Sequence, residues 1–330
     1  MMEKQLALRL YGEMVRIRLI EERVAELYLE QEMRCPVHLC IGQEAVATGI
    51  STCLGNQDYA MSGHRSHGHY LAKGGDLNGM MAELYGKVTG TSRGKGGSMH
   101  LVDLDVGFLG ATPIVASTIP IGVGAAFAAK MLGQNRVSVV YFGEGATEEG
   151  VFHESVSFAL QKKLPVIFVC ENNMYSVYSP LSVRQPDTRK VYEMAGGHGI
   201  ESHHGNGNDV SEVVKLGVAA VEKARNGGGP TFLEFETYRW REHCGPNYDN
   251  KIGYREESEF QEWKLKCPIV KLETHLKSNG LFDEKYEREL HEKIGREIDA
   301  AVKFAKESEF PPASELKANI FVDNMERSEI

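Results

Sequence analysis

Two short apolar runs near the middle of the chain predict neighbouring buried strands. Residues 137–142 and 166–170 are almost wholly β-branched, aromatic or otherwise apolar, as in the strands of a parallel sheet that is covered on both faces. The segment between them is expected to be a helix that opens at Thr147-Glu148-Glu149 and ends at Leu164-Pro165. The pattern therefore predicts a strand–turn–helix–strand unit.

The same reasoning predicts alternating helices and strands along most of the chain. Apolar positions at helical spacing indicate a long amphipathic helix over residues 4–33. Loops are expected at 62–69, 89–100 and 175–191. Further helices are expected at 42–54 and 76–86, in a segment opened by Pro120, at 209–225 and in charged segments to about 308. Further strands are expected at 58–61, 200–205 and 231–236, with an extended piece at 319–322.

Composition and charge narrow the class of protein. With 330 residues, 42% of them hydrophobic and 25% charged, the chain is typical of a globular protein with a sizeable core. A net charge of −9 argues against nucleic-acid partners, and it gives no polybasic signal for binding to a membrane surface. We find no apolar signal core and no run long enough to span a bilayer. The six cysteines are scattered without a C-x-x-C pair, so we expect free thiols and a cytoplasmic protein.

The candidate chemistry lies where two of the predicted strands end. Gly143-Glu144-Gly145-Ala146 follows the first strand and Asn172-Asn173 ends the second, which places both at the edge where open α/β sheets bind ligands. Oxygen ligands, a glycine turn and a helix N-terminus suit a diphosphate held through Mg²⁺. The turn alone fits an ordinary βαβ unit equally well, and the asparagine pair favours the diphosphate.

Other motifs are less specific. His64, His67 and His69 could form a metal site, but nearby carboxylate or thiolate ligands are lacking, so a phosphate-facing loop is favoured. The glycine-rich residues 90–100 lack the Walker pattern and fit a functional loop or a surface turn. A nicotinamide site is disfavoured because residues 143–145 lack the third glycine of the dinucleotide fingerprint.

Several motifs, in the same order, resemble the alpha subunits of thiamine diphosphate-dependent 2-oxo acid and acetoin dehydrogenases, the decarboxylating first component. The segment from Gly143 to Asn173 is similar to the thiamine diphosphate motif, with Glu144 where the family usually has Asp. Further matching segments are 38–45, 65–68, 94–100 and 237–243. The resemblance implies a thiamine diphosphate-binding α/β fold, with a central mostly parallel sheet flanked by helices on both faces. It also implies a single domain over 1–330, with an N-terminal helix at 4–33 and a helical tail from about 255 to 330.

The resemblance also implies roles for individual residues. Mg²⁺ would be coordinated by Glu144, the side chain of Asn173 and the backbone carbonyl of Tyr175. Thiamine diphosphate would be bound by His64, Arg65, Pro113, Val115, Gly145, Ala146, Asn173 and His243, with Pro113 and Val115 holding the aminopyrimidine ring. The candidate catalytic residues are His38, His100 and His243. His64 stands where many relatives have Tyr, and Pro113 where Gly is usual.

The implied reaction is decarboxylation of a 2-oxo acid, or cleavage of acetoin, with transfer of the acyl group to a lipoyl carrier. The implied assembly is an α2β2 heterotetramer whose beta subunit supplies a glutamate to the cofactor, with a lipoyl acyltransferase and a flavoprotein as further components. Two alternatives stay open. One is a thiamine-dependent transferase of acyl or two-carbon units without a lipoyl step, and the other is a non-catalytic Rossmann-like scaffold.

Overall fold

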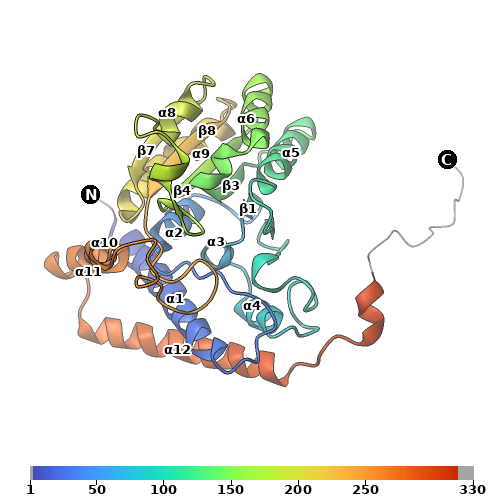
Figure 1. Cartoon of the computed structure of the whole chain (residues 1–330), viewed down its shortest axis with the longest axis vertical. Coiled ribbons are helices and arrows are strands. Elements are labelled where there is room, and N and C mark those ends of the chain that lie inside the picture. Colours follow the sequence, from blue (N-terminus) through green and yellow to red (C-terminus); the bar gives the residue numbers. More distant parts are fainter. Residues whose placement is uncertain (1–2, 319–330) are drawn as a thin grey trace, which may run out of the picture.

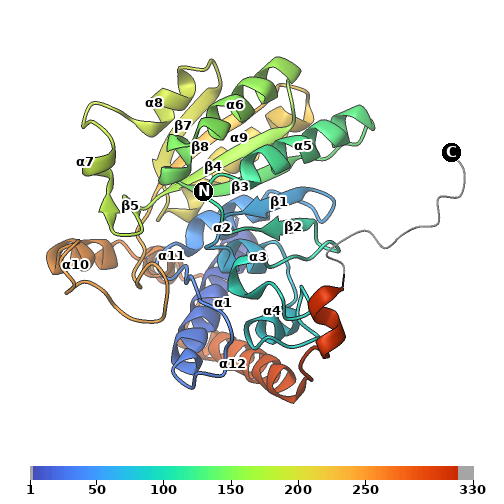
Figure 2. The same ribbon diagram turned by 45° about the vertical axis from the view of Figure 1, so that its right-hand side comes forward.

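A six-stranded sheet forms the centre of the molecule (Figures 1 and 2). The computed structural model describes residues 3–318, so the extended piece expected at 319–322 lies outside the described residues. Every neighbouring pair of strands is parallel, in the order β2-β1-β3-β4-β8-β7. The strands are β1 (Tyr59–Ser62), β2 (Phe108–Ala111), β3 (Ser138–Gly143), β4 (Val166–Asn172), β7 (Glu201–Asn206) and β8 (Thr231–Glu236). The predicted α/β fold with a parallel central sheet is confirmed.

Alternating side chains of the central strands enter two different cores. In β3, Val139 and Tyr141 belong to one hydrophobic cluster, whereas Val140 and Phe142 belong to the other. In β4, Ile167 and Phe168 divide in the same way. Because both faces of these strands are buried, their sequences are continuous apolar runs rather than alternating ones.

Helices cover both faces of the sheet, as expected. One cluster is completed by α5 (Thr118–Met131), α6 (Gly150–Lys162) and α8 (Val191–Gly196). The larger cluster includes side chains of α1, α2, α9 and the C-terminal helices. The remaining helices are α1 (Lys4–Tyr28), α2 (Glu44–Thr52), α3 (His67–Ala72), α4 (Leu77–Leu84), α7 (Leu181–Arg184), α9 (Val210–Arg225), α10 (Glu257–Leu265), α11 (Pro268–Ser278) and α12 (Glu284–Glu307).

The N-terminal helix is shorter than predicted. It ends at Tyr28 rather than at residue 33, because the chain turns there and Gln31 adopts a left-handed conformation with φ of 60°. Within the helical tail predicted from about 255 to 330, the helices α10, α11 and α12 are present; α12 ends at Glu307, residues 308–318 form no further α-helix, and residues 319–330 lie outside the described residues. Buried Ile294, Ile298 and Ala301 pack α12 into the larger core beside α1 and α4, along one side of the molecule in Figure 1.

Other predicted boundaries also differ from the structure. The loop expected at 62–69 ends early, since α3 begins at His67. A 3₁₀ turn over Glu144–Glu148 delays the start of α6 to Gly150. The loop expected at 175–191 contains the helix α7 and a short hairpin of two-residue strands, β5 (Tyr175–Ser176) and β6 (Ser179–Pro180). None of the helices within residues 3–318 combines the length and apolar character needed to cross a membrane.

The strand order places a switch point beside β1. The chain passes from β1 to β2 on one side and then to β3 on the other, so the connections after β1 and β3 diverge and leave a crevice at the carboxyl ends of the strands. This crevice is where the sequence predicts the binding site.

Candidate active site

A cavity of ≈ 220 Å³ opens at the carboxyl edge of the sheet. Its walls come from the turns after β1, β2, β3 and β4, together with His38 and the loop after β8. Every residue expected to bind cofactor or metal lines this cavity: His64, Arg65, Pro113, Val115, Glu144, Gly145, Ala146, Asn173, Tyr175 and His243. His38 lines it as well, whereas His100 is not among the lining residues. The fold thus gathers one cavity from segments that are far apart in the sequence.

The turn after β3 presents a buried carboxylate. Glu144 is 1% exposed, and burial raises the pKa of its carboxyl. Arg184 of α7 donates a hydrogen bond to Glu144 and a second to Glu148. A Cβ atom at Gly145 would lie 3.0 Å from Ser176 Oγ, so the absence of a side chain lets the β5 hairpin approach this turn closely.

The two asparagines that end β4 have different surroundings. Asn172 donates from Nδ2 to Glu234 at 2.7 Å and accepts from Met174 N–H at 3.0 Å. Asn173 lines the cavity, and its Oδ1 accepts from the backbone N–H of Tyr175 at 3.2 Å. Only the second amide is therefore placed to meet a ligand in the cavity.

Arg65 supplies a cation to the cavity. Its guanidinium donates to Leu39 O at 2.7 Å and to His243 O at 3.1 Å. Burial, with a smaller effect from Arg239, lowers the pKa of Arg65 to about 9. The side chain is therefore still charged at neutral pH and can pair with an anion.

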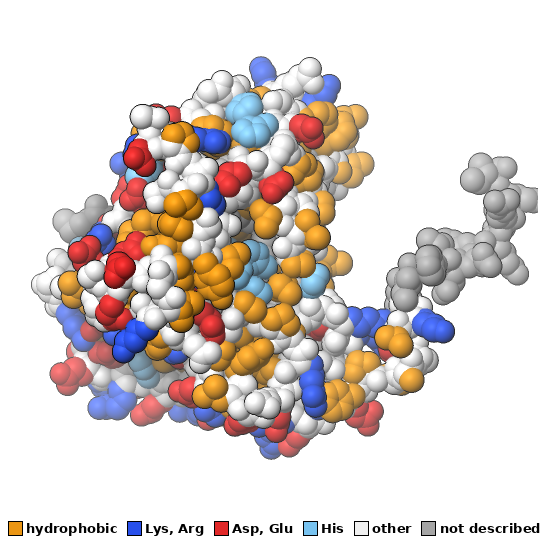
Figure 3. All heavy atoms as spheres, viewed as in Figure 1, with side chains coloured by type: hydrophobic (Ala, Val, Ile, Leu, Met, Phe, Trp, Pro, Cys, Tyr) orange, Lys and Arg blue, Asp and Glu red, His pale blue; other side chains and the backbone are white. Residues whose placement is uncertain are grey.

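Three imidazoles meet at one side of the cavity. The ring centroids of His38, His64 and His243 lie 4.9–5.1 Å from one another. Burial and the nearby Arg65 lower the pKa of His38 to about 2, that of His64 to about 4 and that of His243 to about 3. All three rings are therefore neutral at pH 7. Histidine side chains gather near the middle of the face drawn in Figure 3, among hydrophobic side chains.

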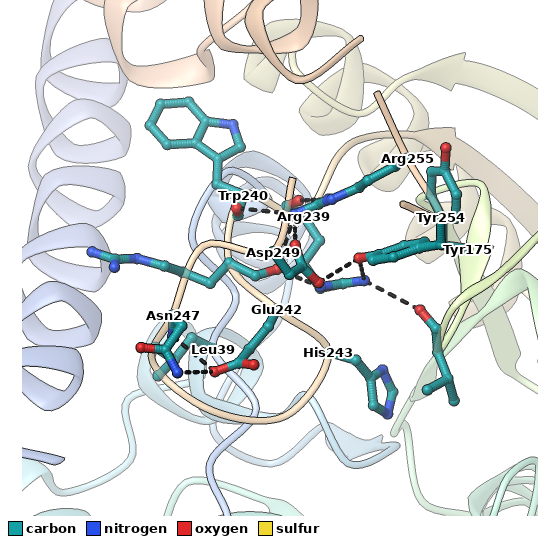
Figure 4. A network of polar contacts seen from close by, with 12 residues as sticks. Leu39, Tyr175, Arg239, Trp240, Glu242, His243, Asn247, Asp249, Tyr254 and Arg255 are labelled. Atoms are coloured by element: carbon teal, nitrogen blue, oxygen red, sulfur yellow. Dashed lines mark hydrogen bonds and ion pairs between the residues drawn. The ribbon is translucent and has the colours of Figure 1, made fainter. Parts of the chain in front are cut away.

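A buried ionic network shapes the loop that carries His243. Asp249 pairs with Arg239 and with Arg255, and each of these three side chains is less than 5% exposed. Arg255 also donates to Arg239 O at 2.7 Å, and Arg239 donates to the hydroxyl of Tyr254 at 3.0 Å. Figure 4 shows His243 on the same loop, with its ring directed away from this network.

The glycine-rich loop before His100 is held by one carboxylate. The buried Glu83 side chain accepts hydrogen bonds of 2.7–2.9 Å from four backbone N–H groups of this loop, those of Ser92, Gly94, Gly96 and Gly97. Arg93 and Lys95 pair with Glu315 instead of facing the cavity. His100 Nδ1 lies 2.7 Å from Gly96 O, so it contributes to loop structure, while its neighbour Met99 reaches the cavity.

The histidines after β1 do not form a common site. His67 lies in α3, with its two ring nitrogens 2.6 Å from Glu21 and 2.7 Å from Ser98. His69 contacts Ser62 at 2.8 Å and Glu171 at 3.3 Å. The metal site considered for residues 64, 67 and 69 is therefore not formed.

Sequence reasoning missed several residues that border the cavity. Ser62, His69 and Glu171 line it: His69 hydrogen-bonds to Ser62 through Nδ1, and its Nε2 lies 3.3 Å from a carboxylate oxygen of Glu171. Glu171 directly precedes the asparagine pair, and this position at a strand end was the available signal. Arg184 gave no signal, because its ion pair depends on the tertiary fold.

A family comparison decides the class of protein. The model of the dehydrogenase E1 component family matches residues 12–314. The chain belongs to the dehydrogenase E1 component family. Its curated relatives place it among the alpha subunits of thiamine diphosphate-dependent 2-oxo acid and acetoin dehydrogenases, so the predicted family and enzyme class are confirmed.

Three relatives show the extent of the similarity of this E1 chain. It is 38% identical over 326 residues to the alpha subunit of acetoin:2,6-dichlorophenolindophenol oxidoreductase of Bacillus subtilis, covering 96% of this chain and 93% of the relative. It is 37% identical to the pyruvate dehydrogenase E1 component subunit alpha of Porphyra purpurea, with 97% and 94% covered. The Rhizobium meliloti protein of the same name is 35% identical, with 96% and 90% covered.

Proposed function

We propose that this chain binds the Mg²⁺–diphosphate half of thiamine diphosphate in the cavity and acts with a beta subunit. The complex would decarboxylate a 2-oxo acid or cleave acetoin, and would pass the acyl group to a lipoyl carrier. The observation that carries the proposal is the convergence of Glu144, Asn173 and Arg65, from the ends of three parallel strands, on one cavity.

The oxygen donors fit Mg²⁺ in kind. A carboxylate, an amide oxygen and a backbone carbonyl come from Glu144, Asn173 and Tyr175, and hard oxygen ligands are what Mg²⁺ prefers. Arg184 holds Glu144, and Tyr175 N–H holds the Asn173 oxygen. Metal binding would therefore replace two existing contacts rather than fill a preformed cage.

The surrounding groups suit a diphosphate and an aromatic ring. Gly145 and Ala146 would offer backbone N–H groups to the diphosphate, and the Arg65 guanidinium would pair with its charge. His64, which lines the cavity beside Arg65, would contact the same group. Pro113 and Val115 also line the cavity. Proline keeps its carbonyl acceptor, so a backbone contact to the aminopyrimidine survives at that position.

The chain's own part in the chemistry is to position groups and to hold protons. When bound, thiamine diphosphate supplies the nucleophile and the electron sink. His38 and His243, neutral at pH 7, can each accept or donate a hydrogen bond at a ring nitrogen in the cavity. A catalytic role for His100 would require the glycine-rich loop to move, since the ring lies outside the cavity.

A partner subunit is part of the proposal. Apolar side chains at the cavity rim are exposed, with Ile114 at 69%, Val115 at 48% and Val177 at 43%, and such residues commonly mark interaction surfaces. The relatives described above are named as alpha subunits. We expect a beta subunit to cover this rim in an α2β2 heterotetramer, with a lipoyl acyltransferase and a flavoprotein downstream.

Calorimetry with thiamine diphosphate and Mg²⁺ tests the cofactor site. The full chain with its beta subunit should bind both, and Glu144→Ala should abolish metal-dependent binding. Normal binding by Glu144→Ala would refute the metal assignment. If the native complex bound neither ligand, the proposed function would be refuted and the non-catalytic scaffold would be favoured. Decarboxylation by the alpha chain alone would refute the need for a partner. Reductive acylation of lipoamide distinguishes a lipoyl acceptor from the transferase alternative.

A further inference from the structure

His38, His64 and His243 come from three separate parts of the chain. His38 precedes α2, His64 follows β1, and His243 lies on the loop after β8. One ring nitrogen from each lies within 4.8 Å of the others. Small rotations of the rings would bring three nitrogens to the spacing at which they share one ligand.

One buried nitrogen of this cluster has no hydrogen-bond partner within the described part of the protein. His38 is 6% exposed and lines the cavity, yet its Nδ1 has no hydrogen-bond partner among the described residues. A buried polar atom without a partner is costly, and inside a cavity a bound ion is one group that can satisfy it. The contrast with His67 is informative, since both ring nitrogens of that fully buried histidine are engaged.

We propose that His38, His64 and His243 form a binding site for a divalent transition metal such as Zn²⁺, separate from the oxygen ligands at Glu144 and Asn173. Imidazole nitrogen suits Zn²⁺, Co²⁺, Ni²⁺ and Cu²⁺, whereas Mg²⁺ prefers oxygen. Three histidines leave a fourth coordination position open to the cavity, where a water or an anionic ligand can bind.

Arg65 limits the affinity of this site. Its Nη2 lies 3.4 Å from His243 Nδ1, so a dication on the histidines is repelled by the guanidinium. An anion in the fourth position offsets that repulsion. We therefore expect a carboxylate or phosphate to strengthen metal binding, unlike at an isolated histidine cluster.

The consequence for activity rests on the proposed function. The three histidines share the cavity with the proposed cofactor and substrate groups, so a metal held there would block access of the 2-oxo acid or acetoin. Zn²⁺ would then inhibit the assembled enzyme, and excess Mg²⁺ would not relieve the inhibition.

Titration of the full chain with Co²⁺, followed by visible absorption, tests the site itself without requiring activity. We expect one Co²⁺ per chain with the intense bands of four-coordinate cobalt, displaced by Zn²⁺. His64→Asn and, independently, His38→Asn should each abolish these bands, with folding checked by circular dichroism.

Two control variants separate this site from others. Glu144→Gln removes the proposed Mg²⁺ ligand and should leave the cobalt bands unchanged. His153 and His198 form a close histidine pair elsewhere, with His153 Nδ1 2.9 Å from His198 Nε2. His153→Asn breaks this pair and should also leave the cobalt bands unchanged. Bands that survive in both folded His64→Asn and His38→Asn chains, or that are lost in either control, would overturn the proposal. Failure here leaves thiamine diphosphate binding, measured by calorimetry, untouched.

Discussion

Arg184 of α7 and Glu144 after β3 form an ion pair beside the cavity, and the same guanidinium also reaches Glu148. Glu144 is almost completely buried, so the guanidinium neutralises a carboxylate that water cannot reach. A cation that binds Glu144 must therefore compete with Arg184.

Replacing Arg184 should strengthen Mg²⁺ binding. In Arg184→Gln the metal no longer displaces a charged hydrogen bond, which contributes about 1.5–3 kcal/mol, so the affinity for Mg²⁺ should rise about tenfold or more. Calorimetric titration in the presence of thiamine diphosphate measures the change. Arg93→Gln, which breaks an ion pair with Glu315 on another loop, is the matched control. A weaker affinity in Arg184→Gln would contradict competition.

Mg²⁺ binding should weaken on acidification at a higher pH than for an ordinary glutamate. Burial raises the pKa of the Glu144 carboxyl above its ordinary value. Protonation therefore begins to remove the ionised form, which Mg²⁺ needs, at a higher pH than for an exposed glutamate. The dissociation constant for Mg²⁺, measured between about pH 5 and 8, should increase as the pH falls. If the affinity for Mg²⁺ did not change across that pH range, the role of Glu144 would be contradicted.

Asp249→Asn should destabilise the loop that carries His243. The substitution leaves the buried Arg239 and Arg255 guanidinium groups uncompensated, and breaking a buried ion pair costs about 3–5 kcal/mol. The expected signs are a lower melting temperature and faster proteolysis within 239–255. Asp299→Asn, which removes a carboxylate that is 76% exposed, should change neither. Equal protease resistance in the two variants would show that the network does not hold this loop.

Glu83→Ala should release the glycine-rich loop. Each stranded N–H donor costs about 1–3 kcal/mol when it stays buried, so the loop is expected to open rather than bear the loss of four bonds. Hydrogen exchange of the amides at residues 92–97 should accelerate in Glu83→Ala, and less in Glu83→Gln, which keeps one carbonyl acceptor. Unchanged exchange in both variants would rule out Glu83 as the anchor.

The sequence was sufficient to predict the sheet, because strands buried on both faces are continuous apolar runs. β3 and β4 appear close to the predicted positions, and α9 begins beside Asp209, whose side chain accepts from two backbone N–H groups as a cap. The end of α1 was not predictable from Pro36, since the helix stops earlier at a turn containing Gln31. The helix α3 was missed because its His-Gly-His start is fixed by tertiary contacts of His67 rather than by helix propensity.

The candidate site was predictable mainly through the resemblance. Spacing alone suggested oxygen ligands at 144 and 173, but no local pattern connects His38 with His243. Contacts that depend on the folded chain, such as Arg184 with Glu144 and His69 with Glu171, leave no periodic trace in the sequence. His100 shows the opposite case, a motif residue whose ring the fold directs to its own loop.

Asn172 and Asn173 at the end of β4 have different contacts, so the two side chains are not interchangeable. Asn172 binds Glu234, and the same carboxylate accepts from Tyr192 N–H in α8 at 2.8 Å. Replacing Asn172 would therefore disturb the packing of β8 and α8, whereas replacing Asn173 would change the lining of the cavity. Attempts to retune the proposed metal site should target residue 173. Deleting one residue within β4 would move Asn173 into the place of Asn172 and Met174 into the place of Asn173, and would damage both the sheet and the site.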